Sequence, residues 1–442
     1  MMSVANGLRS ASHSNFFARV TEFVRDNSYY IAFFLYCVWT WLSRSSFIDG
    51  GGSEPIKLME KIMQIVVLVF LGSAFFRTRA TAREFSVATV LVLLGFVVWR
   101  TAGEGWLFWL VLFVVCGKGA KLSVISNIAL TSALLVAILS ATASAVGIIN
   151  NNVLVRGSTG VIRNPMGFDH PNTFGAVLLV ISASIFMSCE KRGARGSLLF
   201  AAIVCISSAS IAFFVAESRT AALCLFVFSA TILLYMLMKG RSWSFRASAV
   251  LTSLFVGVVA ISIGYMVFYD QNRPFDSMLN SILSGRIRLL NMYYLDHSPR
   301  LLGYDYSSGP MVCIDGKELT FVVDNLYGHV LLRHGLIAFV IFVFAIIALC
   351  IKMYKEKYFG PLLLGMGVFL VYGMSETLGC RVECNFFIIS LWTVLYHRPI
   401  SDFDDAAGSA QENSVSEVEL QSNLSFREFL MLPIKAMRSH RG

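Results

Sequence analysis

Four short polar groups in the sequence carry the residue types that bind phosphate or activate a hydroxyl group. They are FDHPN at 168–172, ESR at 217–219, SGR at 284–286 and DN at 324–325. Arginine binds phosphate oxygens in a bidentate manner and stays charged under physiological conditions, whereas a carboxylate or an imidazole can accept a proton from a hydroxyl. The four groups together predict a site that holds a diphosphate beside a reacting hydroxyl.

Two arginines are the predicted catalytic contacts to the phosphate. Arg219 follows Glu217 in a short turn between two long apolar runs, and the alternative is that these two side chains only pair with each other. On one helix, Arg286 and Arg288 would point about 200° apart, so at most one of them faces a given site. We prefer Arg286, which shares its predicted face with apolar residues. Arg288 is kept as a substrate ligand, with lipid headgroups as its alternative contact.

Asp324 is the predicted catalytic carboxylate, because it stands at the head of an apolar run and could orient or deprotonate a hydroxyl. Its simplest alternative role is to cap the N-terminus of that helix. Asn325 and His329 follow it closely and are predicted substrate ligands. His329 also remains an alternative base.

A second set of predicted substrate ligands surrounds Pro171. Proline suits the first position of a helix, so His170 and Asn172 are expected at the rim of a helix start, with Arg163 upstream as a companion. The alternative is a capped helix start that contacts no substrate. His170 is a further candidate for the base.

The remaining sequence consists mostly of apolar segments that must position these groups. Of 442 residues, 56% are hydrophobic, and the formal charges are 36 Lys and Arg and 27 Asp and Glu, about half the share found in soluble proteins. Apolar runs of roughly 17 to 25 residues can cross a bilayer as helices. We therefore predict an all-α polytopic integral membrane protein with about twelve transmembrane helices. The predicted spans are 29–43, 58–76, 85–99, 105–117, 122–149, 173–188, 197–216, 220–238, 247–269, 326–350, 358–375 and 384–397.

The positive charges predict an orientation for these helices. With a cytoplasmic N-terminus, every second loop carries two or three Lys or Arg, as short cytoplasmic loops do. Residues 1–28 and 398–442 are then cytoplasmic, and the net charge of +9 reflects topology rather than a nucleic-acid partner. The four polar groups share the opposite face. FDHPN, ESR and DN stand at starts of inward-running helices, where helix dipoles favour anions, and SGR lies in the long outer loop.

Residues 270–325 are predicted to form a long extracytoplasmic loop between helices 1–9 (29–269) and helices 10–12 (326–397). Apolar residues near helical spacing at 279–293 predict one interfacial helix within it. The tail segment 423–442 is amphipathic and basic and predicts another. The nine cysteines form no CxxC pair and the outer loops contain no DxD pair, so we predict neither a zinc site nor a disulfide framework, and metal-independent chemistry without a cofactor.

The order and spacing of these motifs resemble the O-antigen polymerase and ligase superfamily, in particular its Wzy-type polymerase branch. The motifs are HPN at 170–172, ESR at 217–219, SGR at 284–286 and DN-x9-G from Asp324 to Gly335. The resemblance covers roughly residues 163–395 and implies a C-type glycosyltransferase fold. It also implies that undecaprenyl-diphosphate-linked repeat units are polymerised into a surface polysaccharide (O-antigen, capsule or exopolysaccharide) on the outer face of the bacterial cytoplasmic membrane. Ligase relatives carry His where this sequence has Asp324, which favours the polymerase.

The implied chemistry agrees with the residue types, because a diphosphate leaving group needs charge stabilisation more than it needs a proton. The implied partners are lipid-linked oligosaccharides, membrane lipid, and a chain-length regulator and flippase of the same pathway. Two alternatives remain open: a ligase that transfers the glycan to another acceptor, and a lipid-linked oligosaccharide flippase. The near absence of ionisable residues inside spans two to five disfavours the flippase.

Overall fold

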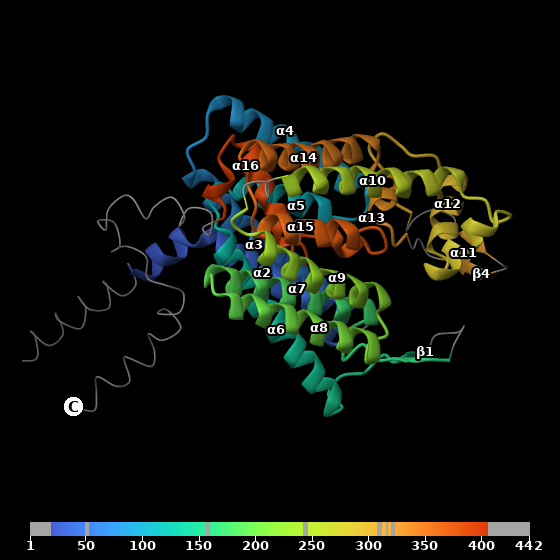
Figure 1. Ribbon diagram of the computed structural model, residues 1–442. Coiled ribbons are helices and arrows are strands. Elements are labelled where there is room, and N and C mark those ends of the chain that lie inside the picture. The colour runs from blue at the N-terminus through green and yellow to red at the C-terminus, as the bar shows by residue number, and fades with distance from the viewer. Residues whose placement is uncertain are drawn as a thin grey trace, which may run out of the picture.

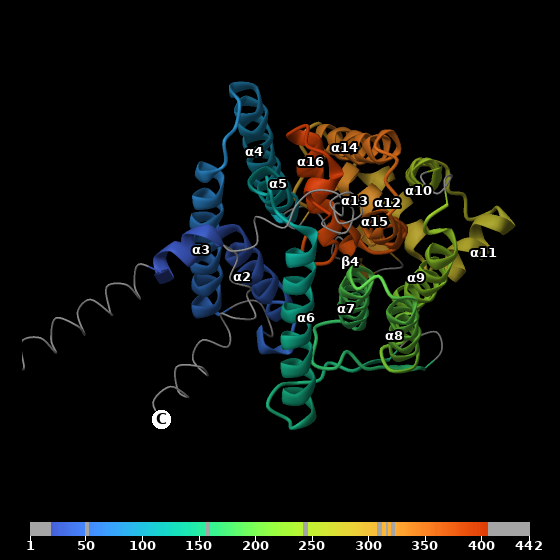
Figure 2. The same ribbon diagram turned by 60° about the vertical axis from the view of Figure 1, so that its left-hand side comes forward.

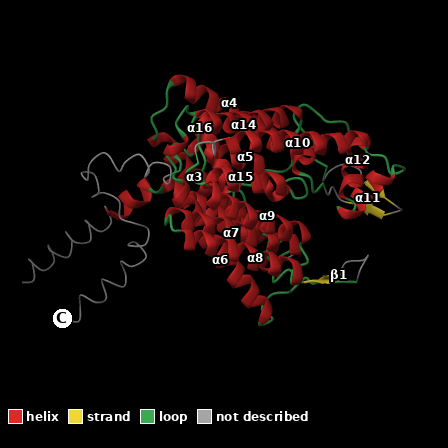
Figure 3. Ribbon diagram, in the orientation of Figure 1, coloured by secondary structure: helices red, strands yellow, loops and turns green. Residues whose placement is uncertain are grey.

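The computed structural model describes residues 19–48, 53–155, 160–241, 246–306, 312–314, 317–319 and 323–404. It is a bundle of helices with two short antiparallel hairpins (Figure 1). Strand β1 (Leu154–Val155) pairs with β2 (Ile162–Arg163), and β3 (Val312–Ile314) pairs with β4 (Lys317–Leu319). Both hairpins lie at the same end of the bundle, and the β3–β4 hairpin lies beside helices α11 (Pro274–Ile282) and α12 (Arg286–Asp296) (Figure 3).

Eight helices among the described residues are long and apolar enough to cross a membrane. They are α3 (Glu54–Arg77), α4 (Ala82–Ala102), α6 (Leu122–Ala145), α7 (Pro171–Lys191), α8 (Arg195–Phe214), α9 (Arg219–Met238), α10 (Ala247–Phe268) and α14 (Leu336–Lys355). Shorter apolar elements are α2 (Ser28–Leu42), α5 (Trp106–Cys116), α15 (Pro361–Tyr372) and the segment Phe386–Leu395, which ends in α16 (Leu391–Leu395). Large apolar side chains such as Val69 and Phe226 point outward, as lipid-facing residues do. The chain is an all-α multi-pass membrane protein.

Helix α7 lies inside the bundle and packs against α6, α8, α9 and α15. Figure 2 shows it between α6 and α8, while α3 and α4 occupy the opposite flank from α8 and α10. Gly175 allows close packing at its first turns, because a Cβ there would lie 2.7 Å from Ser218 Oγ and from Ala221 Cβ. This close approach brings the starts of α7 and α9 together.

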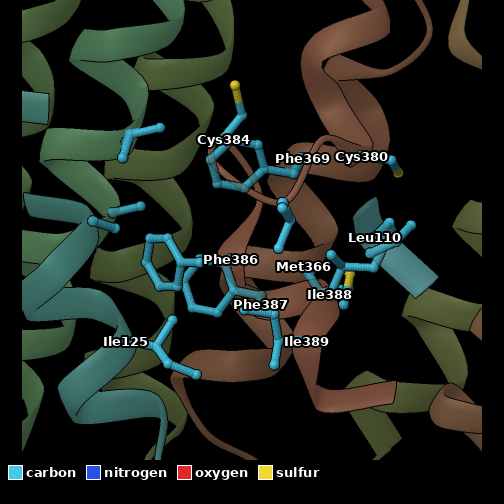
Figure 4. Packing of buried hydrophobic residues seen from close by; sticks show 14 of the residues in the cluster. Leu110, Ile125, Met366, Phe369, Cys380, Cys384, Phe386, Phe387, Ile388 and Ile389 are labelled. Atoms are coloured by element: carbon cyan, nitrogen blue, oxygen red, sulfur yellow. The ribbon is translucent and has the colours of Figure 1, made fainter. Parts of the chain in front are cut away.

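Aromatic side chains fill the core between α15 and the segment that follows it. Phe386 and Phe387 stack with ring centroids 4.3 Å apart, and Figure 4 shows them beside Phe369 and Met366 of α15. The ring of Phe387 lies against Gly365, where a Cβ would collide with it. The glycine therefore lets the 373–385 connection return into the bundle.

Two of the twelve predicted spans are not continuous α-helices. The predicted span 326–350 is divided into α13 (Leu326–His329), a π-helical turn (Val330–His334) and α14, with Gly335 at the break. The predicted span 384–397 begins as a 3-10 helix (Phe386–Ser390) before α16. The count of twelve spans stays a prediction.

The long polar segment contains two helices. The prediction of one continuous interfacial helix at 279–293 was therefore wrong. Helix α11 ends before Ser284 and Gly285, both of which have positive φ (57° and 83°), and α12 begins at Arg286. Such backbone angles cannot continue a right-handed helix. Ile282 is exposed on α11 and does not belong to the face proposed for Arg286, whereas Leu290 and Tyr293 are buried on α12 at four and seven positions after Arg286.

Residues 398–404 pack onto the bundle rather than extending from it as a free tail. Phe403 is fully buried, and its carbonyl accepts a hydrogen bond of 2.8 Å from the amide of Leu122. The hydroxyl of Tyr358 donates to Asp404. The predicted amphipathic helix at 423–442 lies outside the described residues.

We expect Gly335→Ala to destabilise the protein by about 1–3 kcal/mol. Gly335 has φ 93° and ψ 169°, a conformation that is essentially restricted to glycine. A Cβ there would also press against the carbonyls of Arg300 and Leu301, which accept hydrogen bonds from the start of α14. Thermal unfolding in detergent measures the effect.

Gly264→Ala in α10 is the matched control, because a Cβ at Gly264 meets no atom within 4 Å. Equal unfolding temperatures for the two variants would contradict the predicted strain at Gly335.

Candidate functional site

The candidate site lies at the end of the bundle that carries α11, α12 and the β-hairpins (Figure 1). Four segments far apart in sequence meet there: the start of α7, the start of α9, the start of α12 and the connection 373–385. A continuous chain of ion pairs and hydrogen bonds joins them, and we call it the arginine cluster. Its members are Arg163, Asn172, Glu217, Arg219, Arg286, Asp324 and Glu376.

Arg286 occupies the middle of the arginine cluster and has three partners. Its Nε lies 3.1 Å from Asp324 Oδ2, and its Nη2 lies 2.8 Å from Glu376 Oε1. Its Nη1 donates to the carbonyl of Ser375. The turn at Ser284 and Gly285 permits these contacts, because it starts a new helix at Arg286.

Asn172 connects Arg286 to the start of α7. Its Nδ2 donates to Glu376 Oε1 at 2.7 Å, and its Oδ1 accepts from Arg163 Nη2 at 2.8 Å and from Ser218 Oγ at 3.3 Å. Every polar atom of this amide is therefore used within the cluster. The predicted association of Asn172 with Arg163 is present in the structure.

Arg219 lies at the edge of the arginine cluster and pairs with Glu217, as the simpler interpretation of ESR allowed. Its Nη2 lies 2.7 Å from Glu217 Oε1, and the side chain of Arg219 remains 51% exposed. Glu217 Oε2 also lies 3.8 Å from Arg163 Nε. Exposure leaves the guanidinium of Arg219 open to a further anion.

His170 caps α7 and borders the arginine cluster. Its Nδ1 accepts a hydrogen bond of 3.1 Å from the amide of Asn172, which places the proton of the neutral ring on Nε2. Burial and the positive charge of Arg163 lower the pKa of His170 to about 4, against the opposing charge of Asp324. His170 is therefore neutral at physiological pH.

We expect His170→Asn to make the free energy of unfolding less dependent on pH under acidic conditions. The unfolded imidazole titrates near pH 6.5 and the folded one near 4, so the unfolded chain binds the proton first. The contribution of the neutral His170 to the free energy of unfolding is complete above about pH 6.5 and is lost as the pH falls through about 4. Asparagine keeps a capping oxygen without titrating.

The measurement is the unfolding temperature between pH 4 and 7.5, with the exposed His397 changed to Asn as the control. An unchanged pH dependence in His170→Asn would contradict this assignment.

Three further predicted substrate ligands contact residues outside the arginine cluster. Asn325 is buried, caps α13 through the amide of Gly328, and donates to Ser262 Oγ at 2.9 Å, which is a structural role. Arg288 is half-buried on α12, and its amide donates to Asn280 Oδ1. His329 points to Glu104, with Nε2 and Oε2 2.8 Å apart.

Glu104 is the centre of a second charged group, to which His329 belongs. Its carboxylate also lies 2.6 Å from Arg381 Nη2 and 3.4 Å from Arg333 Nε. Burial raises the pKa of Glu104, but His329 and Arg381 outweigh that effect and hold it below its usual range. Glu104 is therefore ionised.

The residues predicted from the sequence did not include the carboxylates Glu104 and Glu376, and Glu217 was predicted only as an alternative partner of Arg219. Glu376 is the most consequential, because it joins Arg286 to Asn172 while its side chain is only 7% exposed. Burial raises its pKa above the ordinary value, and the charge of Arg286 opposes that shift. An ionisable residue beside an apolar run was the available signal.

The arginine cluster balances three guanidinium groups against three carboxylates. An anionic ligand must therefore displace a carboxylate or bind at an exposed edge. Asp324 is the most exposed of the three carboxylates, with 33% of its side chain accessible, whereas Glu217 and Glu376 are buried. A phosphate could thus replace Asp324 at Arg286 and leave that carboxylate beside the bound ligand.

Comparison of the chain with protein-family models, with curated proteins and with solved structures found no match. Among the described residues, no group of three or more His, Cys, Asp or Glu side chains could hold a metal ion.

Proposed function

We propose that the protein is a polysaccharide polymerase that joins undecaprenyl-diphosphate-linked repeat units by glycosyl transfer on the outer face of the bacterial cytoplasmic membrane. The observation that carries this proposal is the arginine cluster at one end of an apolar bundle, with Arg286 held between a partly exposed and a buried carboxylate. The motif resemblance supports the same assignment, since its HPN, ESR, SGR and DN elements all contribute to the cluster or border it.

In the proposed reaction, the hydroxyl of the acceptor sugar attacks the anomeric carbon of the donor sugar. The new glycosidic bond forms as the bond from that carbon to the diphosphate oxygen breaks. The electron pair leaves with undecaprenyl diphosphate, and the hydroxyl proton passes to a base. Each cycle consumes one lipid-linked unit and releases one lipid diphosphate without an oxidant, a reductant or a nucleotide.

The side chains take separate roles in this proposal. Arg286 and the exposed Arg219 bind the diphosphate and stabilise the charge that develops on it. Asp324, displaced from Arg286, accepts the proton of the acceptor hydroxyl. The sugar or phosphate groups contact Arg163, His170 and other residues near the start of α7.

We further propose cytoplasmic termini, twelve spans and a C-type glycosyltransferase-like fold, with a flippase and a chain-length regulator of the same pathway as partners. Alternating basic loops support this orientation. It places the arginine cluster outside the cytoplasm, where a glycosyl donor arrives on a lipid because nucleotide sugars are absent.

The experiment that tests the function is chain lengthening by the purified protein in lipid nanodiscs supplied only with lipid-linked repeat units. We expect longer lipid-linked glycans and released undecaprenyl diphosphate, with no loss of activity when EDTA is present. In a second assay with lipid A core added as an acceptor, transfer to that core without chain lengthening would identify a ligase. Movement of intact substrate across a proteoliposome membrane without lengthening would identify a flippase, and either result would overturn the proposal.

A further inference from the structure

A cavity of about 330 Å³ lies between α2, α3 and the connection from α4 to α5. Aromatic rings from three elements form much of its wall: Tyr36 and Trp39 of α2, Trp99 of α4, and Trp106 and Trp109 of α5. Tyr36 and Trp109 are in contact, with ring centroids 5.4 Å apart. Its volume is at the lower end of the range for small-ligand pockets, about 300–1,000 Å³.

Two polar residues of the membrane-spanning helix α3 also line this cavity. Glu60 and Gln64 are one turn apart, and Gln64 Nε2 donates to Glu60 Oε1 at 3.0 Å. Gln64 lies ten residues into the helix, or roughly 15 Å along its axis. Polar groups inside a predicted membrane span are costly and are kept mainly where they pair or serve a ligand.

The charges around the cavity disfavour a diphosphate as its natural occupant. Arg44 is paired with Glu383 at 3.1 Å, and Arg381 is paired with Glu104 at 2.6 Å. Glu60 then adds a further carboxylate. An anion would meet neutralised arginines and an uncompensated negative charge, whereas a neutral molecule rich in hydroxyl groups would find both donors and acceptors.

We propose that this cavity binds sugar rings of the substrate glycan. Flat aromatic faces cover the apolar faces of a sugar ring, and carboxylate, amide and guanidinium groups match its hydroxyls. This inference rests on the proposed function, and it assigns glycan recognition to α2, α3 and α5, away from the motif residues.

The cavity and the arginine cluster are connected by shared chain segments. The connection 373–385 carries Glu376 in the cluster and Arg381 at the cavity, five positions later. On the other side, the carbonyl of Arg44 accepts a hydrogen bond of 2.9 Å from the amide of Asp169, next to His170. A glycan joined to a diphosphate at Arg286 can therefore extend toward the tryptophan-lined wall.

The test is a binding titration of the full chain in nanodiscs, followed by tryptophan fluorescence. The two probes are the oligosaccharide released from lipid-linked repeat units and undecaprenyl diphosphate without sugar. We expect Glu60→Gln and Trp39→Ala each to weaken oligosaccharide binding by about tenfold, the loss of roughly 1.4 kcal/mol. Neither variant should change the binding of undecaprenyl diphosphate.

Glu54→Gln is the matched control, because Glu54 lies on the same helix, is 86% exposed, and pairs with Lys57 outside the cavity. Unfolding temperatures show whether Trp39→Ala is folded, and Glu60→Gln, which conserves shape, keeps the test valid if it is not. Unchanged oligosaccharide binding in Glu60→Gln, or equal weakening of both probes, would overturn the cavity assignment. A wild-type protein that binds the oligosaccharide but neither binds undecaprenyl diphosphate nor lengthens glycans would instead refute the proposed function.

Discussion

Arg286→Ala is expected to lower the rate of glycan lengthening by at least about 100-fold, the effect typical of removing one group that stabilises transition-state charge. Arg286 is the guanidinium that contacts both Asp324 and Glu376. Its loss removes a phosphate ligand and leaves the carboxylate of Glu376 buried without its positive partner. The measurement is the initial rate with lipid-linked repeat units at saturating concentration, together with the affinity for undecaprenyl diphosphate.

Two further variants separate catalysis from folding. Arg286→Lys keeps the positive charge beside Glu376, so we expect a folded protein that still loses at least about tenfold in rate, because lysine cannot reproduce the planar contacts of arginine. Arg273→Ala is the control, since Arg273 belongs to the same polar segment and is 66% exposed. Wild-type rates in a folded Arg286→Ala protein would remove Arg286 from the proposed mechanism.

Asp324→Asn is expected to lower kcat by about 10²- to 10⁴-fold, the usual contribution of a general base. Affinity for undecaprenyl diphosphate should stay the same or increase. The physical reason is that Asp324 competes with phosphate for Arg286, at a distance of 3.1 Å from its Nε. Asparagine removes this competing charge as well as the base, so kcat should fall while the affinity for undecaprenyl diphosphate does not.

The control for this prediction is Asp296→Asn, at the exposed C-terminal end of α12, which should change neither quantity. A loss of affinity in Asp324→Asn without a fall in kcat would show that Asp324 binds substrate rather than accepting the proton. His170 and His329 would then be the candidate bases, and of these His170 borders the cluster while His329 contacts Glu104.

Arg286 and Arg219 are already paired with carboxylates, and this pairing affects which phosphate-bearing lipid can bind them. A single phosphate group must compete with the carboxylates that already hold Arg286 and Arg219. A diphosphate carries more charge and, in the proposed function, binds both Arg286 and Arg219. The proposal therefore predicts that the carboxylates favour a lipid diphosphate over lipids with weaker headgroup charge.

Local sequence patterns were sufficient for several features of the site. The start of α7 at Pro171 and the start of α9 at Arg219 follow from helix-start residues and from the ends of apolar runs. The grouping of Asn172 with Arg163 could also be predicted, because the two residues are only nine positions apart. The break between α11 and α12 was missed, since helical spacing alone does not reveal the positive φ of Ser284.

The sequence by itself determined that the chain is helical and lies in a membrane, because long apolar runs can satisfy their backbone hydrogen bonds in lipid only within helices or closed barrels. It also indicated which helix ends carry polar groups. Only the tertiary structure decided how those groups pair. Glu376 reaches Asn172 across 204 positions and Arg286 across 90, and no local pattern encodes such contacts. Burial, which makes an unpaired charge costly, selects these partners once the helices have packed.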